Sequence, residues 1–217
     1  MILKQNKMKK KYLFIIPLLL FILDYILIEL GYMYNIDWNV YYTVQLLNSN
    51  IMTYFFKLCS FLGGTYFYIT LIILLMIIKN KKEIFIGIHL LIIQGINRII
   101  KYLVKRPRPP RLLHLVTESN YSFPSGHSMS AMIGYGLLIV EVANSNFKYK
   151  KILMFILGLM IFLIGLSRIY LGVHYFSDVI GGFLLSLSYL LFIYYLSFIL
   201  LQNVENCNNI RIFHSKN

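Results

Sequence analysis

The feature that most constrains this chain is a series of long apolar segments that contain almost no charged residues. Hydrophobic residues make up 59% of the 217 residues and charged residues only 13%, whereas soluble domains carry about 25% charged residues. A helix of roughly 20 apolar residues spans the hydrocarbon core of a bilayer. The sequence therefore predicts an all-α fold, an integral membrane helical bundle whose apolar side chains face lipid.

Six segments have the length and composition of transmembrane helices. We expect them at about 12–31, 61–78, 84–102, 125–143, 151–169 and 178–201. The stretch 33–58, between the first two, is rich in aromatic residues, namely Trp38, Tyr41, Tyr42, Phe55 and Phe56. Because aromatic residues favour the head-group level, we expect an interfacial helical segment there, with a re-entrant segment as the alternative. No internal repeat or soluble domain is visible, so we treat 1–217 as a single membrane domain.

The net charge of +13 is unevenly distributed along the chain. In a soluble protein this charge would suggest nucleic acid binding; here we expect no nucleic acid partner, and lipid head groups instead. Cytoplasmic loops of membrane proteins are enriched in Lys and Arg, which places the basic tail 1–11 and the tail 202–217 in the cytoplasm. The first segment resembles a signal peptide without a cleavage site, and we interpret it as an uncleaved span.

A second group of cations lies where this topology disfavours them, at the outer ends of the third and fifth spans and in the loop between the third and fourth. They are Arg98, Lys101, Lys105, Arg106, Arg108, Arg111 and Arg168. Such a concentration of positive charge indicates a site for an anion. We expect this site to face the outside of a plasma membrane.

Several of these cations, together with one helix start, have the chemistry of a phosphate site. Guanidinium groups bind phosphate in bidentate geometry, and lysine adds a compact positive charge. Ser125 and Gly126 follow a proline and open the fourth span, where free N–H groups and the helix dipole attract anions. The predicted substrate-phosphate-binding residues are Lys101, Arg108, Ser125, Gly126 and Arg168.

Two histidines and an aspartate complete the predicted site. His174 and Asp178 are four residues apart, so on a helix they would share one face. A carboxylate that binds one ring nitrogen leaves the other free to act as a nucleophile. His127, from a different span, is suited to protonate the leaving oxygen. We predict catalytic roles for His174, His127 and Asp178, with no metal and no cofactor.

Three motifs in this region resemble those of the type 2 phosphatidic acid phosphatase family. They are Lys, six residues, Arg-Pro at 101–109; Pro-Ser-Gly-His at 124–127; and Ser-Arg, five residues, His, three residues, Asp at 167–178. The motifs cover 101–178, and the span pattern extends the resemblance over most of the chain.

The resemblance implies a helical bundle that hydrolyses lipid phosphates or diphosphates without a metal. It implies that Lys101, Arg108, Ser125, Gly126 and Arg168 bind the phosphate. It also implies that His174 forms a phosphohistidine, that Asp178 orients it and that His127 is the general acid.

Alternatives remain open for the substrate and the reaction. The substrate is either a glycerolipid phosphate, such as phosphatidylglycerophosphate or phosphatidate, or an isoprenoid diphosphate such as undecaprenyl diphosphate; Lys105, Arg106 and Arg111 could serve a second phosphate. The same intermediate would also serve a lipid phosphotransferase. A non-catalytic, anion-binding membrane transporter is the alternative outside enzymes. Vanadium haloperoxidases share these motifs, but they are soluble. The sequence leaves the oligomeric state open.

The remaining polar residues receive minor interpretations. An ionisable residue at membrane depth usually has a partner, and for Asp24 we expect Asn97 or Arg98; Glu29 reaches the outer interface. We expect His89 to be a hydrogen-bonded core residue, and we assign no role to His114, which lies in the outer loop near the site, or to His214 in the C-tail. Cys59 and Cys207 match no zinc spacing and predict no disulfide.

Overall fold

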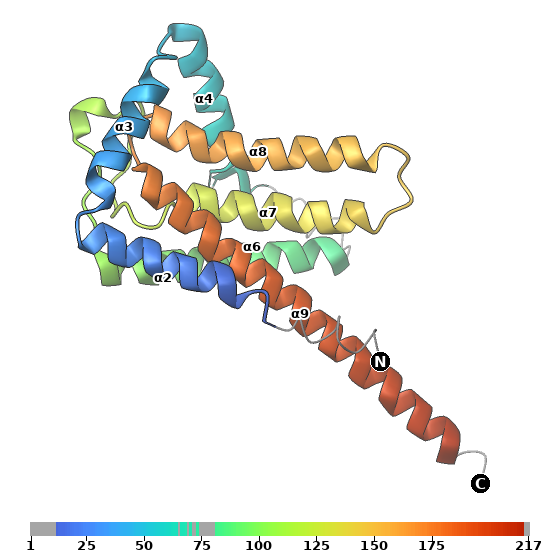
Figure 1. Ribbon diagram of the computed structural model, residues 1–217. Coiled ribbons are helices and arrows are strands. Elements are labelled where there is room, and N and C mark those ends of the chain that lie inside the picture. The colour runs from blue at the N-terminus through green and yellow to red at the C-terminus, as the bar shows by residue number, and fades with distance from the viewer. Residues whose placement is uncertain (1–11, 65, 69, 71–72, 74–80, 215–217) are drawn as a thin grey trace.

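The computed structural model describes residues 12–64, 66–68, 70, 73 and 81–214. All elements within these ranges are helices, and none is a β-strand (Figure 1). In chain order they are α2 (Ile15–Glu29), α3 (Met33–Gln45), α4 (Asn50–Leu62), α6 (Lys81–Val104), the short 3-10 helix η1 (Arg111–Leu113), α7 (Gly126–Ala143), α8 (Lys150–Tyr170) and α9 (Phe176–His214). The predicted all-α fold is confirmed.

Four of these helices contain segments that are long and apolar enough to cross a membrane. They are Ile84–Val104, Gly126–Ala143, Lys150–Tyr170 and Phe176–Leu196, close to the third to sixth predicted spans. The first predicted span contains α2, which with α3 forms a fifth candidate bent by 96°. Half of the second predicted span, 61–78, and the tail 1–11 lie outside the described residues. The count of six spans therefore stays a prediction, whereas a multi-pass membrane protein is supported.

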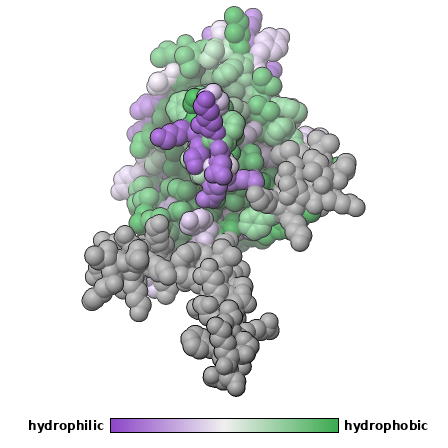
Figure 2. All heavy atoms as spheres, turned by 90° about the vertical axis from the view of Figure 1, so that its right-hand side faces the viewer, coloured by the Kyte–Doolittle hydropathy of each residue, from purple (hydrophilic) through white to green (hydrophobic). Residues whose placement is uncertain are grey.

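The exterior of the bundle has the character that lipid requires. Large apolar side chains such as Leu103 on α6 and Phe155 on α8 are exposed. Figure 2 shows the end of the molecule where α7 turns into α8, and there one hydrophilic patch is surrounded by hydrophobic side chains. A surface of this kind is favourable in a bilayer, because lipid tails solvate it without the cost that water would impose.

The aromatic stretch 33–58 forms α3 and the greater part of α4, not one continuous helix. Ser49 caps α4, since its side chain accepts a hydrogen bond from the N–H of Met52 (3.2 Å). Both helices pack against α8. The ring of Phe56 lies 4.4 Å from that of Tyr170, and Gln45 donates to the Tyr170 carbonyl (2.8 Å). The position of this stretch at the membrane interface stays a prediction.

The carboxyl ends of α6 and α8 and the amino ends of α7 and α9 meet at one end of the bundle, on the left of Figure 1. The loop 105–125 and α3 lie at the same end. Close packing of α8 on α9 depends on Gly165, because a Cβ there would lie 2.5 Å from the Phe183 ring. The three motifs lie at these helix ends and in the loop between them, so all three motifs reach the same region.

Candidate active site

His174 lies in the short turn that joins α8 to α9. Gly172 has a φ of 70°, a left-handed conformation that glycine adopts at no steric cost. The N–H of Gly172 donates to the Ile169 carbonyl (2.9 Å), and the N–H of Val173 donates to the Arg168 carbonyl (3.2 Å). This pair of bonds is a Schellman motif. It ends α8 sharply and places His174 just beyond the last turn of that helix.

His174 and Asp178 are in contact, but the expectation that they share a helix face is wrong. α9 begins only at Phe176, so His174 precedes the helix. Asp178 accepts a hydrogen bond from the backbone N–H of Tyr175 (2.9 Å), and the same oxygen lies 3.3 Å from His174 Nδ1. An acidic residue in the first helical turn often bonds the N–H of the residue before the helix. This helix cap brings the carboxylate to the imidazole.

The hydrogen bonds of His174 indicate which of its ring nitrogens carries the proton. Nη1 of Arg108 lies 3.1 Å from His174 Nε2. A guanidinium group can only donate, so Nε2 accepts and the ring proton is assigned to Nδ1, where it points at Asp178. Burial, followed by the positive charges of Arg108 and Lys101, holds the pKa of His174 well below its ordinary value. The ring is therefore neutral, with its free lone pair directed at the cations.

Two guanidinium groups face each other across Glu118, a residue that the sequence arguments overlooked. Arg168 is buried and donates to the Glu118 carboxylate and to Ser60 Oγ. Arg108 Nη2 lies 3.4 Å from the other carboxylate oxygen and 2.7 Å from Asn120 Oδ1. Glu118 thus takes donors from two of the predicted phosphate ligands. The overlooked signal is that Glu118 is the one acidic residue between 105 and 125, a stretch with four cations.

Lys101 sits at the end of α6 and is buried. Its ammonium group donates to the backbone carbonyls of Tyr121 and Ser122 (3.1 Å for the latter). The Ser122 hydroxyl has two acceptors for its one proton, the Pro107 carbonyl (3.1 Å) and Asp178 Oδ1 (3.3 Å). Lys101 therefore holds the end of the loop 105–125 next to the predicted site and adds a positive charge there.

The start of α7 is fixed against the start of α9. The N–H of Ser125 donates to the Asp178 carbonyl (2.9 Å), and the Ser125 hydroxyl accepts from that of Ser128 (2.9 Å). Gly126 and His127 form the first turn, whose N–H groups have no acceptor within the helix. His127 lies close enough to Arg168 and His174 for their charges to act on its ring. Gly64 lies beside this imidazole, since a Cβ on Gly64 would be 3.5 Å from His127 Nε2, an ordinary van der Waals contact.

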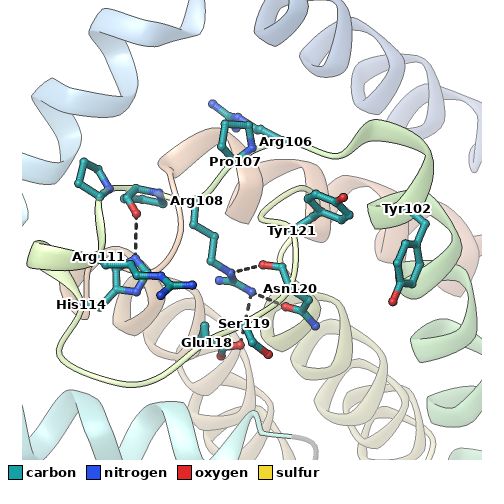
Figure 3. Close-up of a pocket in the computed structure, with 12 residues that line it drawn as sticks. Tyr102, Arg106, Pro107, Arg108, Arg111, His114, Glu118, Ser119, Asn120 and Tyr121 are labelled. Atoms are coloured by element: carbon teal, nitrogen blue, oxygen red, sulfur yellow. Dashed lines mark hydrogen bonds and ion pairs between the residues drawn. The ribbon is translucent and has the colours of Figure 1, made fainter.

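A cavity of about 650 Å³ opens beside Arg108 (Figure 3). It is lined by residues between Tyr102 and Tyr121, including Arg111. Figure 3 shows Arg108 extending toward Asn120 and Glu118, with Arg106 on the other side of the loop. The cavity reaches Arg108, whereas His174, which this guanidinium contacts, is buried and does not line it.

A family model described as the PAP2 superfamily matches residues 82–201, more than half of the chain. The chain belongs to the PAP2 superfamily. It is 42% identical to a phosphatidylglycerophosphatase B of Bacillus subtilis (strain 168) over 113 residues, which are 49% of this chain and 54% of that protein. The match therefore spans only about half of that relative. An undecaprenyl-diphosphatase of Sulfolobus acidocaldarius is 32% identical over 189 residues, 82% of this chain and 87% of that protein.

Solved structures agree with this membership. The crystal structure of a transmembrane PAP2-type phosphatidylglycerolphosphate phosphatase from Bacillus subtilis matches with a TM-score of 0.73 and 30% identity, over 86% of this chain and 96% of that one. Aquifex aeolicus LpxE matches with a TM-score of 0.58 and 24% identity, over 75% of this chain and 95% of that one; that likeness concerns the fold alone.

Two expectations about this PAP2 chain need correction. Arg106, considered as a cation for a second phosphate, has its terminal nitrogens in ion pairs with Asp37 and Asp178. Among the described residues Asp24 pairs with neither Asn97, whose amide donates to the Pro124 carbonyl (2.9 Å), nor Arg98, with which it forms no ion pair. No donor among the described residues bonds Asp24 Oδ2, which faces Gly181 of α9.

Other predicted residues take the positions expected of them. His89 Nδ1 lies 2.8 Å from the Tyr189 hydroxyl, which confirms a hydrogen-bonded histidine between α6 and α9. His114 Nε2 lies 2.9 Å from the Pro109 carbonyl, and the ring lines the cavity of Figure 3. Within the described residues, no group of three or more His, Cys, Asp or Glu side chains is placed to hold a metal ion.

Proposed function

We propose that this protein is a membrane phosphatase that hydrolyses a lipid phosphate or diphosphate through a phosphohistidine on His174. The observation that carries the proposal is the pair of contacts on its ring: Nδ1 against Asp178 (3.3 Å) and Nε2 against Arg108 (3.1 Å). A neutral imidazole that is oriented in this way has its nucleophilic lone pair where a phosphate on Arg108 would lie. A transporter that only binds anions would not need this arrangement.

The reaction has two displacement steps. In the first, His174 Nε2 forms a bond to phosphorus while the bond from phosphorus to the lipid oxygen breaks, and His127, which enters this step protonated, gives that oxygen a proton and becomes neutral. In the second, water attacks phosphorus, the N–P bond breaks and His127 takes the proton from the water. The products are the lipid alcohol, or the lipid monophosphate from a diphosphate, and orthophosphate, with His174 neutral again.

Charge on the transferred phosphoryl group is stabilised by fixed donors. Arg108, Arg168 and Lys101 supply three positive charges, and the first turn of α7 at Ser125 and Gly126 supplies N–H groups. Preorganised donors of this kind are the main source of catalysis in phosphoryl transfer. This chemistry is metal-independent, because these groups provide the neutralisation that metal ions give in other phosphatases.

The proposed substrates follow the relatives and the cavity. Phosphatidylglycerophosphate and undecaprenyl diphosphate are the leading candidates, since two relatives are named phosphatidylglycerophosphatase B and undecaprenyl-diphosphatase. Arg111 and His114 line the cavity beside Arg108, where they can contact the rest of a head group. The distribution of Lys and Arg supports a plasma membrane location, with both termini cytoplasmic and the site at the outer face.

The test is phosphate release by the purified protein in detergent with EDTA, from phosphatidylglycerophosphate, undecaprenyl diphosphate and phosphatidate in parallel. We expect release from at least one lipid and none from the variant His174→Ala. The matched control is His89→Ala, which removes an imidazole outside the site. Activity in His174→Ala would refute the mechanism, and loss of wild-type activity in EDTA would refute metal independence. Addition of a lipid alcohol shows whether the phosphoryl group goes to water or to that acceptor.

A further inference from the structure

We propose that Asp37 and Arg106 are positioning residues that hold Asp178, and through it His174, in the reactive arrangement. The inference rests on the proposed function, since it assigns a role in the reaction of His174. Neither residue is among the fixed positions of the three motifs, and Asp37 lies on α3, far from them in sequence.

The guanidinium group of Arg106 joins two carboxylates with different nitrogens. Nη1 lies 2.6 Å from Asp178 Oδ1, and Nη2 lies 2.8 Å from Asp37 Oδ2. The planar group fixes the angle between these donors. Its face lies 4.4 Å from the ring centre of Tyr175, a cation–π contact that adds a third restraint. Arg106 therefore relates the position of α3 to that of the carboxylate beside His174.

Asp37 also binds the first turn of α9 directly. One of its oxygens accepts from the N–H of Ser177 (2.8 Å) and from the hydroxyl of the same residue (2.9 Å). The hydroxyl oxygen of Ser177 lies 2.8 Å from Arg106 Nη1. The N–H of a first helical turn has no partner in its own helix, so Asp37 caps α9 from a neighbouring helix. The start of α9, which carries Asp178, is thus held by α3.

These contacts leave the Asp178 carboxylate little freedom to rotate. Oδ1 accepts from Arg106 and from Ser122 (3.3 Å), while Oδ2 accepts from the N–H of Tyr175 and faces His174. Loss of the Arg106 bond would leave Oδ1 with one long hydrogen bond and free the carboxylate to turn. The imidazole would then lose the partner that orients it.

Two carboxylates hold the single positive charge of Arg106 between them. Asp37 and Asp178 are buried and Arg106 nearly so. Burial alone would lower the pKa of Arg106, and the two carboxylates together raise it above its ordinary value. Arg106 therefore keeps its positive charge between the two carboxylates.

Two variants separate geometry from charge. Asp37→Asn removes the carboxylate that holds Arg106 and Ser177. Arg106→Lys keeps the positive charge, but a single ammonium group cannot reproduce the planar fork that joins both carboxylates. Small misplacements of reacting groups cost up to about 100-fold in rate. We expect kcat to fall about tenfold to 100-fold in each variant, with KM within about twofold of wild type, because neither residue contacts the proposed phosphate ligands.

The matched control is Glu29→Gln. Glu29 is exposed, lines the same cavity of about 420 Å³ as Asp37, and loses the same charge in the variant. We expect its kcat and KM to equal those of wild type. For every variant, the rise in melting temperature on addition of orthophosphate reports whether the phosphate site is intact, so loss of folding is distinguished from loss of positioning.

A double-variant cycle tests whether Asp37 acts through Asp178. In an Asp178→Asn background, Asp37→Asn should have no further effect on kcat, because the carboxylate that it positions is absent. A further tenfold fall would overturn the inference, and so would wild-type kcat in Arg106→Lys, whether or not Asp37→Asn folds. The proposed function fails separately, if wild-type protein releases no phosphate from any lipid.

Discussion

The variant Glu118→Gln removes the negative charge that links the two guanidinium groups of the proposed phosphate site. Glu118 accepts hydrogen bonds from both Arg168 and Arg108. A phosphate that enters the site must take the same donors, so the carboxylate and the phosphate compete. Glutamine has nearly the same shape but carries no charge. We therefore expect the variant to bind orthophosphate more tightly than wild type does.

The size of the effect follows from the contacts that the phosphate must displace. Hydrogen bonds to charged groups contribute about 1.5–3 kcal/mol. The Glu118 side chain is 21% exposed, and because water weakens its ion pairs, we take the lower end, about 1.5 kcal/mol. A difference of about 1.4 kcal/mol is tenfold in affinity. The inhibition constant of orthophosphate should therefore fall about tenfold.

The assay is product inhibition of lipid-phosphate hydrolysis by added orthophosphate, at one pH and one detergent concentration. The control is the variant Glu29→Gln, because Glu29 is exposed and has no ion pair with Arg108 or Arg168. This control should leave the inhibition constant within about twofold of wild type. An inhibition constant that is unchanged or larger in Glu118→Gln would refute the competition. A loss of kcat at constant inhibition constant would instead indicate that Glu118 takes part in the chemistry.

Three further predictions concern pH, packing and topology. Because burial and then Arg108 lower the pKa of His174, and because only the neutral ring can attack, kcat/KM should not yet decline as the pH falls through 6.5, after correction for ionisation of the substrate. The variant Arg108→Gln should shift that decline to higher pH, and a wild-type decline centred at or above 6.5 would contradict the assignment. Gly165→Ala places a Cβ 2.5 Å from the Phe183 ring, an overpacking of about 1–3 kcal/mol, so its melting temperature should drop; Gly158→Ala, on the same helix with no atom within 4 Å, should melt no lower than wild type. A reporter fused after residue 217 should read cytoplasmic, and an external signal would overturn the proposed orientation.

The helices within residues 82–201, the part of the chain that matches the family model, were predictable because apolar runs and their polar boundaries determine them. The expected span 84–102 corresponds to Ile84–Val104, and 151–169 corresponds to Lys150–Tyr170. Pro124 and Ser125 marked the start of α7 correctly, since a serine after a proline commonly caps a helix. The motif spacing also identified side chains that the fold brings to one end of the bundle.

Asp37 and Glu118 could not be assigned by the same means. Their partners lie far away in sequence: Asp37 bonds Arg106 and Ser177, and Glu118 bonds Arg168. Such pairs depend on how each helix is rotated about its axis and on the path of the loop 105–125. Neither is encoded in local periodicity.

The errors at Asp24 and His174 have related causes. The pairing of Asp24 with Asn97 or Arg98 assumed a rotation of α2 that apolar residues on all sides of this helix do not specify. The shared helix face of His174 and Asp178 assumed a continuous helix, whereas Gly172 ends α8 and the next helix starts after His174. The contact was predicted correctly, although the local structure that makes it was not.

The measurement that tests the central claim most directly is a rapid-quench experiment with a lipid substrate labelled in its terminal phosphate. We predict a transient label on the protein that is stable in base, labile in acid and located on His174 by peptide mapping, and absent in His174→Ala. Hydrolysis of the lipid at wild-type rate without any protein-bound label, or with the label on a residue other than His174, would contradict the account.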